Sequence, residues 1–131
     1  ACYGRGGQVP TLTDAHVIRN TVRPEAFLGG RMAIFSDRSR AVFQPIADQL
    51  GMSLEDAADS AVQLANANVG RAIQLVTTER GFDPRDYVLV PFGGAGPLHA
   101  ASVASDLGIA QVVVPPSAGV ISAYGLIASD F

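Results

Sequence analysis

The strongest constraint on the fold of this chain is a pair of short apolar runs. A glycine-rich turn and a helical pattern separate them. The runs are Tyr87–Phe92 and Gln111–Val114, and unbroken runs of this length are typical of strands buried on both faces of a parallel sheet. Between them, Leu98–Leu107 has a helical pattern that Gly108 ends. The order strand, loop, helix, strand predicts an α/β fold, helix-rich with a small parallel sheet and a right-handed crossover.

Apolar residues at three- and four-residue spacing predict two longer helices upstream. One begins at Ser36 and ends at Gly51, and Pro45 inside it either delays its start or kinks it. The other begins at Ser53, continues to Arg80 and would be about 40 Å long at 1.5 Å per residue. Many alanines lie on its apolar stripe, which permits close approach of a neighbouring helix or sheet.

The first 35 residues are irregular by comparison. Only Ala15–Asn20 has a helical pattern there, with Thr13 or Asp14 as its cap. We therefore expect the chain to be a single fragment of a longer domain. Residues 1–35 would form an irregular segment, and residues 36–131 a helical and β-α-β portion.

The turn Gly93, Gly94, Ala95 and Gly96 joins the first predicted strand to its helix. Its three glycines lack a β-carbon, so the backbone can adopt positive φ angles and approach a ligand closely. Pro97 suits the first turn of the helix, whose free N–H groups attract anions. Ligands of open parallel sheets collect at such loops, which predicts a nucleotide-contacting turn. Tight packing of the backbone without a ligand is the alternative.

Four further polar residues are candidates for the same site. His99, just after the turn, could contact a ligand or bond to a neighbouring carbonyl, and Asp14 is either a helix cap or a site residue. Asn68 falls near the apolar stripe of the long helix and could reach the glycine turn, unless nearby backbone satisfies it. Ser117 follows the second strand and could complete a wall of the site. These residues form no complete catalytic set and no metal-ligand cluster, so the catalytic residues stay unassigned.

Composition excludes several classes of function. The nine basic residues are all arginines, spread along a chain of net charge −3, so no basic stripe for nucleic acid is present. The absence of lysine excludes Schiff-base chemistry and a Walker-type phosphate lysine. The single cysteine, Cys2, cannot form an internal disulfide or a zinc cage. No apolar run approaches the roughly 18 residues of a membrane span, and we expect a cytoplasmic protein.

Ordered blocks over nearly the whole chain resemble the hydantoinase A / 5-oxoprolinase family. They are Ala1–Gly7, Pro10–Ala15, Phe27–Gly30, Glu79–Tyr87, Phe92–Ala100 and Ser122–Gly125. The resemblance implies an actin-like ATPase, in which ATP lies between two ribonuclease-H-like lobes. It also implies that Gly93, Gly94, Ala95 and Gly96 form the adenosine side of the nucleotide site.

The family's two Asp-Gly-Gly-Thr-type phosphate loops, which position Mg²⁺ and the triphosphate, do not occur in these 131 residues. The chain therefore resembles a partial ribonuclease-H-like lobe, the second lobe of the ATPase, able to fold but inactive alone. ATP and Mg²⁺ are expected as cofactors of the full-length protein, and none is expected in the fragment.

The resemblance implies an ATP-dependent cyclic amide hydrolase, of the N-methylhydantoinase or 5-oxoprolinase type, as the parent protein. Its partners would be a small cyclic amide substrate and a second, hydantoinase B-type subunit or domain. One alternative is a subunit of an ATP-dependent ketone carboxylase from the same family. Another is a non-catalytic lobe whose long alanine-faced helix serves subunit packing.

Overall fold

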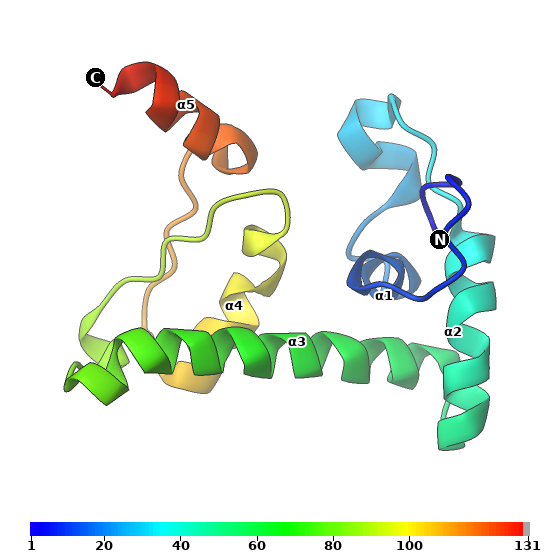
Figure 1. Cartoon of the computed structure of the whole chain (residues 1–131), viewed down its shortest axis with the longest axis horizontal. Helices are drawn as coiled ribbons and strands as arrows, with labels where there is room; N and C mark the ends of the chain where they lie inside the picture. The colour runs from blue at the N-terminus through cyan, green and yellow to red at the C-terminus, as the bar shows by residue number, and fades with distance from the viewer. Residues whose placement is uncertain (130–131) are drawn as a thin grey trace. The chain divides into compact units, whose positions relative to one another are not determined.

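A computed structural model describes residues 1–129 of the chain (Figure 1). The chain divides into two compact units, Ala1–Ala65 and Asn66–Phe131. The boundary falls inside the longest helix, α3 (Leu54–Val76). At 1.5 Å per residue this helix is about 34 Å long.

The first unit begins with the short helix α1 (Leu12–Ile18). Thr11 is its N-cap and forms a reciprocal capping box with Asp14. The prediction of a helix over Ala15–Asn20, capped by Thr13 or Asp14, was therefore three residues late. Asp14 does take part in capping, but from the third helical position, where its carboxylate accepts from the Thr11 backbone N–H.

A 3-10 helix, η1 (Pro24–Gly30), leads to α2 (Ser36–Leu50). Helix α2 begins at Ser36 and continues through Pro45, which is exposed, so the proline does not delay the start. The helix ends at Gly51, which adopts the left-handed conformation with φ +65°, as a terminal glycine is expected to do.

The core of the first unit lies where α1, α2 and the start of α3 meet. Phe43 and Ala47 of α2 pack against Ala15 of α1 and against four residues of α3. The α3 residues are Leu54, Ala57, Ala58 and Val62. Ser53 begins α3 as predicted, because its hydroxyl oxygen accepts from the Asp56 N–H at 3.0 Å.

The second unit contains the remainder of α3 and five shorter helices. These are η2 (Thr78–Arg80), η3 (Pro84–Asp86), α4 (Gly96–Leu107), η4 (Ala118–Val120) and α5 (Ile121–Ala128). Helix α3 ends four residues before the predicted Arg80, and η2 completes the turn up to Gly81, with φ +83°. Gly108 ends α4 in the same left-handed manner, with φ +69°.

The predicted parallel sheet is reduced to a single parallel bridge between Leu89 and Val112. The Leu89 N–H donates to the Gln111 carbonyl at 3.0 Å, and the Val113 N–H donates to the Leu89 carbonyl at 2.9 Å. The predicted pairing and direction are thus present, but residues 1–129 contain no extended strand ladder. Val90 and Val113 are about half exposed. The prediction of strands buried on both faces was wrong for this part of the chain.

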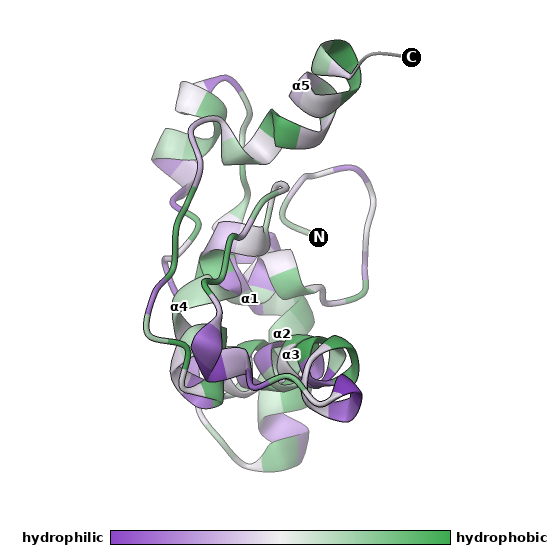
Figure 2. Ribbon diagram, turned by 90° about the vertical axis from the view of Figure 1, so that its left-hand side faces the viewer, coloured by the Kyte–Doolittle hydropathy of each residue, from purple (hydrophilic) through white to green (hydrophobic). Residues whose placement is uncertain are grey.

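Helix α5 is short and carries apolar side chains, visible as green ribbon in Figure 2. Tyr124, Leu126 and Ile127 are all exposed, Ile127 by 85%. Within residues 1–129, no helix combines the length and hydropathy needed to span a bilayer.

Candidate functional site

The glycine turn has one position at which glycine is required by the backbone. Gly93 has φ +86°, whereas Gly94 and Gly96 do not adopt positive φ. A β-carbon on Gly93 or Gly94 would meet nothing within 4 Å. The turn therefore leaves open space on the side where a ligand would approach, and only Gly93 resists substitution through backbone strain.

Helix α4 begins directly at this turn. Gly96 is its first residue, Pro97 lies in its first turn, and no side chain caps it, because Ala95 is the N-cap. The N-terminus of such a helix favours an anionic group through its N–H donors and its dipole. A β-carbon on Gly96 would lie 3.7 Å from Cβ of Pro91, an ordinary van der Waals distance.

The loop after the second extended segment lies against the glycine turn. The Gly93 N–H donates to the Ala118 carbonyl at 2.8 Å. Ser117, the preceding residue, is exposed and adopts φ +56°, an uncommon conformation for a residue other than glycine. The predicted proximity of the Ser117 loop and the turn is present in the structure.

His99 lies on α4, one turn into the helix, and is 7% exposed. Its Nδ1 is 2.7 Å from Oδ1 of Asn66 on α3, which is 6% exposed. Asn68 was expected either to reach toward the turn or to be buried against nearby backbone; it is exposed instead, and the asparagine that contacts His99 is Asn66. The buried face of α3 instead follows four-residue spacing through Val62, Asn66 and Gly70. That spacing is visible in the sequence and would have selected Asn66.

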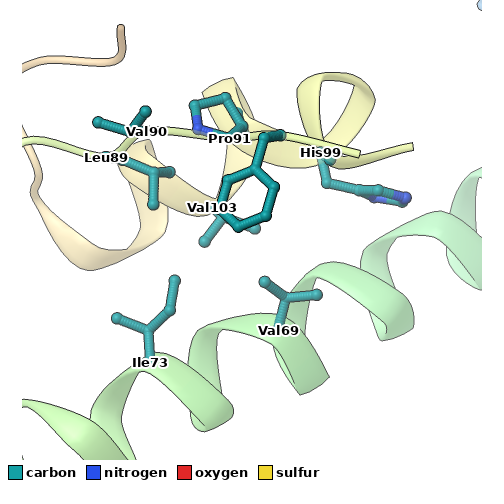
Figure 3. Close-up of a pocket in the computed structure, with 10 residues that line it drawn as sticks. Val69, Ile73, Leu89, Val90, Pro91, His99 and Val103 are labelled. Atoms are coloured by element: carbon teal, nitrogen blue, oxygen red, sulfur yellow. The ribbon is translucent and has the colours of Figure 1, made fainter. Parts of the chain in front are cut away.

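An apolar pocket of about 190 Å³ lies between α3, α4 and the segment 89–92 (Figure 3). Its labelled lining residues are Val69, Ile73, Leu89, Val90, Pro91, His99 and Val103. Val69 and Ile73 project from α3 toward the extended segment (Figure 3). The volume is below the range of about 300–1,000 Å³ typical of small-molecule sites. We therefore do not assign a whole ligand to this pocket; it adjoins the glycine turn through Gly96.

Asp14 belongs to the first unit and is fully buried. Its carboxylate accepts from the Thr11 hydroxyl at 2.7 Å, the Ser39 hydroxyl at 2.8 Å and the Cys2 N–H at 2.8 Å. Burial raises the pKa of Asp14, but these hydrogen bonds outweigh burial and hold the pKa well below its usual range. The described contacts give Asp14 a structural role that joins three segments of this unit.

No group of three or more histidine, cysteine or acidic side chains with metal-binding spacing occurs among residues 1–129. Among the described residues, Asp83 is a second acidic group with a strongly lowered pKa, and it is partly exposed. Hydrogen bonds from Arg85 lower the pKa of Asp83 to about 2. This pair stabilises the turn at η3 and does not point to a reaction.

Comparison with known proteins gives consistent matches over the whole chain. The family model described as Hydantoinase/oxoprolinase matches residues 1–131. An uncharacterised protein of Methanocaldococcus jannaschii is 41% identical over 129 residues, which are 98% of this chain and 19% of that protein. Caprolactamase subunit alpha of Pseudomonas jessenii is 38% identical over 130 residues, again 98% and 19% of the two chains.

A solved structure shows the same fold. Nucleotide-free acetone carboxylase, described as ATP-dependent, superposes with a TM-score of 0.91 at 33% identity. The match covers 99% of this chain and 19% of that one. The chain thus spans about a fifth of the length of the relatives that it matches.

Proposed function

Since this chain belongs to the hydantoinase/oxoprolinase family, we propose that it forms part of an ATP-dependent hydrolase of cyclic amides. In this proposal the turn Gly93–Gly96 contacts the adenosine side of the nucleotide. The fold would be part of a ribonuclease-H-like lobe of an actin-like ATPase. The phosphate loops and the Mg²⁺ site would belong to other parts of the full-length protein.

The conformation of the glycine turn carries this proposal. Gly93 holds a left-handed backbone, and the space around Gly93 and Gly94 is open. Helix α4 begins at Gly96, three residues after Gly93, without a side-chain cap. A turn of this kind lets a ligand approach the backbone closely and presents N–H donors to it. Caprolactamase, an amide hydrolase by name, is among the relatives and is a subunit of a larger enzyme, which supports a partner subunit.

In the proposed chemistry, ATP activates the amide for cleavage. A phosphoryl group passes from ATP to the amide oxygen, and ADP leaves. Water then adds to the activated carbon, the C–N bond breaks, the amine takes a proton, and phosphate is released. During these steps the described residues would bind and orient the nucleotide. The groups that contact the amide would come from other segments.

The test substitutes Gly94 with valine in the full-length protein. Gly94 does not adopt positive φ, and a β-carbon on it would meet nothing within 4 Å, so valine there obstructs the open space without straining a left-handed backbone. We expect Gly94→Val to weaken binding of ATP with Mg²⁺, measured by calorimetry, and to reduce ATP-dependent turnover. Gly125→Val on α5 is the matched control, because Gly125 also has open surroundings and no positive φ. Equal ATP affinity in wild type and folded Gly94→Val would reject the assignment of the turn.

An ATP-dependent ketone carboxylase subunit is the second candidate, supported by the superposition on acetone carboxylase. The two activities differ in which co-substrate stimulates release of phosphate from ATP. Hydantoin, 5-oxoproline or caprolactam would stimulate the hydrolase, whereas acetone with bicarbonate would stimulate the carboxylase. Measuring ATP consumption with each set in the full-length protein, together with its partner subunit, separates the two.

A further inference from the structure

We propose that Asn66 is a positioning residue, which holds His99 and thereby fixes the start of α4 for nucleotide binding. The inference rests on the proposed function, because only the proposed function assigns a nucleotide to the glycine turn. It concerns two residues, 33 positions apart in sequence, whose side chains meet inside the second unit.

The contact between the two side chains is short and shielded. Nδ1 of His99 and Oδ1 of Asn66 are 2.7 Å apart, and each residue is more than nine-tenths buried. Burying an amide and an imidazole among apolar neighbours is unfavourable unless they bond to a partner. The pair therefore holds α3 and α4 in one relative orientation more strictly than two apolar side chains in van der Waals contact would.

The position of His99 connects this bond to the turn. His99 follows Gly96 by three residues, so the two lie on the same face of α4, about one turn apart. Both line the apolar pocket, together with Pro91; His99 and Pro91 are labelled in Figure 3. Rotation of α4 about its axis would break the His99 bond and move Gly96 away from the pocket at the same time. Helical N–H groups point along the axis, so this rotation would change the position of the first N–H donors around the axis. The His99 bond thus holds the position of the N–H donors at the start of the helix.

The bond also determines which nitrogen of the imidazole carries the proton. An amide oxygen only accepts hydrogen bonds, so Nδ1 of His99 donates, and in the neutral ring Nε2 is the acceptor. An asparagine in place of His99 offers an amide N–H near the position of Nδ1, whereas a glutamine mimics Nε2 instead. The two amide variants of His99 therefore separate a role of Nδ1 from a role of Nε2.

The experiment measures binding of ATP with Mg²⁺ to the full-length protein, after thermal unfolding has shown which variants are folded. Asn66→Leu should raise the Kd and the KM for ATP about tenfold, the scale of one net hydrogen bond. The KM for the organic substrate should stay unchanged. Asn68→Leu is the matched control, because Asn68 is exposed two residues further along the same helix, and it should bind ATP as the wild type does. A folded Asn66→Leu with wild-type ATP affinity would overturn the inference.

A second pair of variants decides the question if Asn66→Leu does not fold. His99→Asn, which can still donate to Asn66, should keep ATP affinity within about twofold to threefold of wild type. His99→Gln should weaken ATP binding about as much as Asn66→Leu does. Equal losses in the two His99 variants would overturn the positioning role, as would a loss of thermal stability without any change in the KM for ATP.

The outcome of Gly94→Val separates the two proposals. If Gly94→Val weakens ATP binding and Asn66→Leu does not, the turn contacts the nucleotide and the role of Asn66 is refuted. If neither variant affects ATP binding, both the nucleotide assignment and the positioning role are refuted.

Discussion

The Gly93 N–H donates a hydrogen bond to the carbonyl oxygen of Ala118, with nitrogen and oxygen 2.8 Å apart. This bond joins two loops that each follow one of the extended segments paired at Leu89 and Val112. Because those segments are parallel, their carboxyl ends face the same way, and both loops lie at one edge. A backbone hydrogen bond from another loop thus holds the glycine turn in place. The conformation of the turn can be tested by measuring the free energy of unfolding, without a ligand.

We predict that Gly93→Ala destabilises the second unit by about 1–2 kcal/mol, because a β-carbon is unfavourable at positive φ. Gly94→Ala is the matched comparison, with no positive φ and the same open surroundings. It should leave the free energy of unfolding unchanged or raise it by a few tenths of a kcal/mol. Urea unfolding of the 131-residue chain measures both, and similar losses in the two variants would contradict the assigned turn.

We predict that Asp14→Asn destabilises the first unit by about 3 kcal/mol. Each carboxylate oxygen of Asp14 accepts from donors: the Cys2 N–H and the Ser39 hydroxyl on one, the Thr11 N–H and hydroxyl on the other. An asparagine places an NH₂ group against one of these sets, whichever way it is turned, and so leaves buried donors facing a donor. Chemical unfolding gives the free energy.

The control for Asp14 is Asp48→Asn on α2. Asp48 is exposed, and its side chain accepts from Gln44 one helical turn away. Asparagine removes the charge but keeps an oxygen that can accept from Gln44, so a change below about 0.5 kcal/mol is expected. If both variants lost a similar amount of stability, the buried hydrogen bonds of Asp14 would contribute no more than an exposed surface contact.

The pH dependence of stability should carry the signature of Asp14. Its folded pKa lies below the unfolded value of 3.8, so its stabilisation is complete above that value and is lost as the pH falls toward the folded pKa. Below about pH 4 the wild type should therefore lose stability with a slope of up to about 1.4 kcal/mol per pH unit from this group. Asp14→Asn should remove that component.

A second acidic group titrates in the same range and must be separated from Asp14. The pKa of Asp83 is lowered to about 2 through Arg85, but the pair is exposed. About 1 M salt screens such surface interactions far more than buried ones. The acid slope that depends on Asp14 should consequently persist in high salt, and its disappearance there would contradict the assignment to a buried carboxylate.

Local signals predicted the start of α3 and the ends of α2 and α4, because the residues at these positions act through their own backbone. Helix α1 begins three residues earlier than predicted, and α3 ends four residues earlier. Ser53 begins α3, and Gly51 and Gly108 end α2 and α4 in left-handed conformations. The sequence also identified the glycine turn and its proximity to the loop of Ser117. These features depend on contacts between residues close in sequence, or on the direction of two paired segments.

Features that depend on distant partners were not predictable in the same way. The buried environment of Asp14 requires Ser39, 25 residues away, and a capping pattern alone does not reveal it. Asn66 and Asn68 differ by two positions on one helix, and only the register of the buried face separates them. The two apolar runs predicted a doubly covered sheet, yet one bridge forms, because burial on both faces needs neighbours that these 129 described residues do not supply.

The core of the first unit gives the last prediction. Phe43 is 3% exposed and packs between α1 and α3, so Phe43→Ala removes a buried ring and leaves a cavity, at about 3–5 kcal/mol. Leu50→Ala on the same helix is the comparison, because Leu50 is 58% exposed and should change stability by less than about 1 kcal/mol. Phe43 lies in the first unit, whereas α4 lies in the second. In Phe43→Ala, hydrogen exchange should therefore speed up more at the α2 amides than at the α4 amides. If the amides of α4 respond as strongly, the two units unfold as one cooperative body and the division at α3 has no energetic meaning.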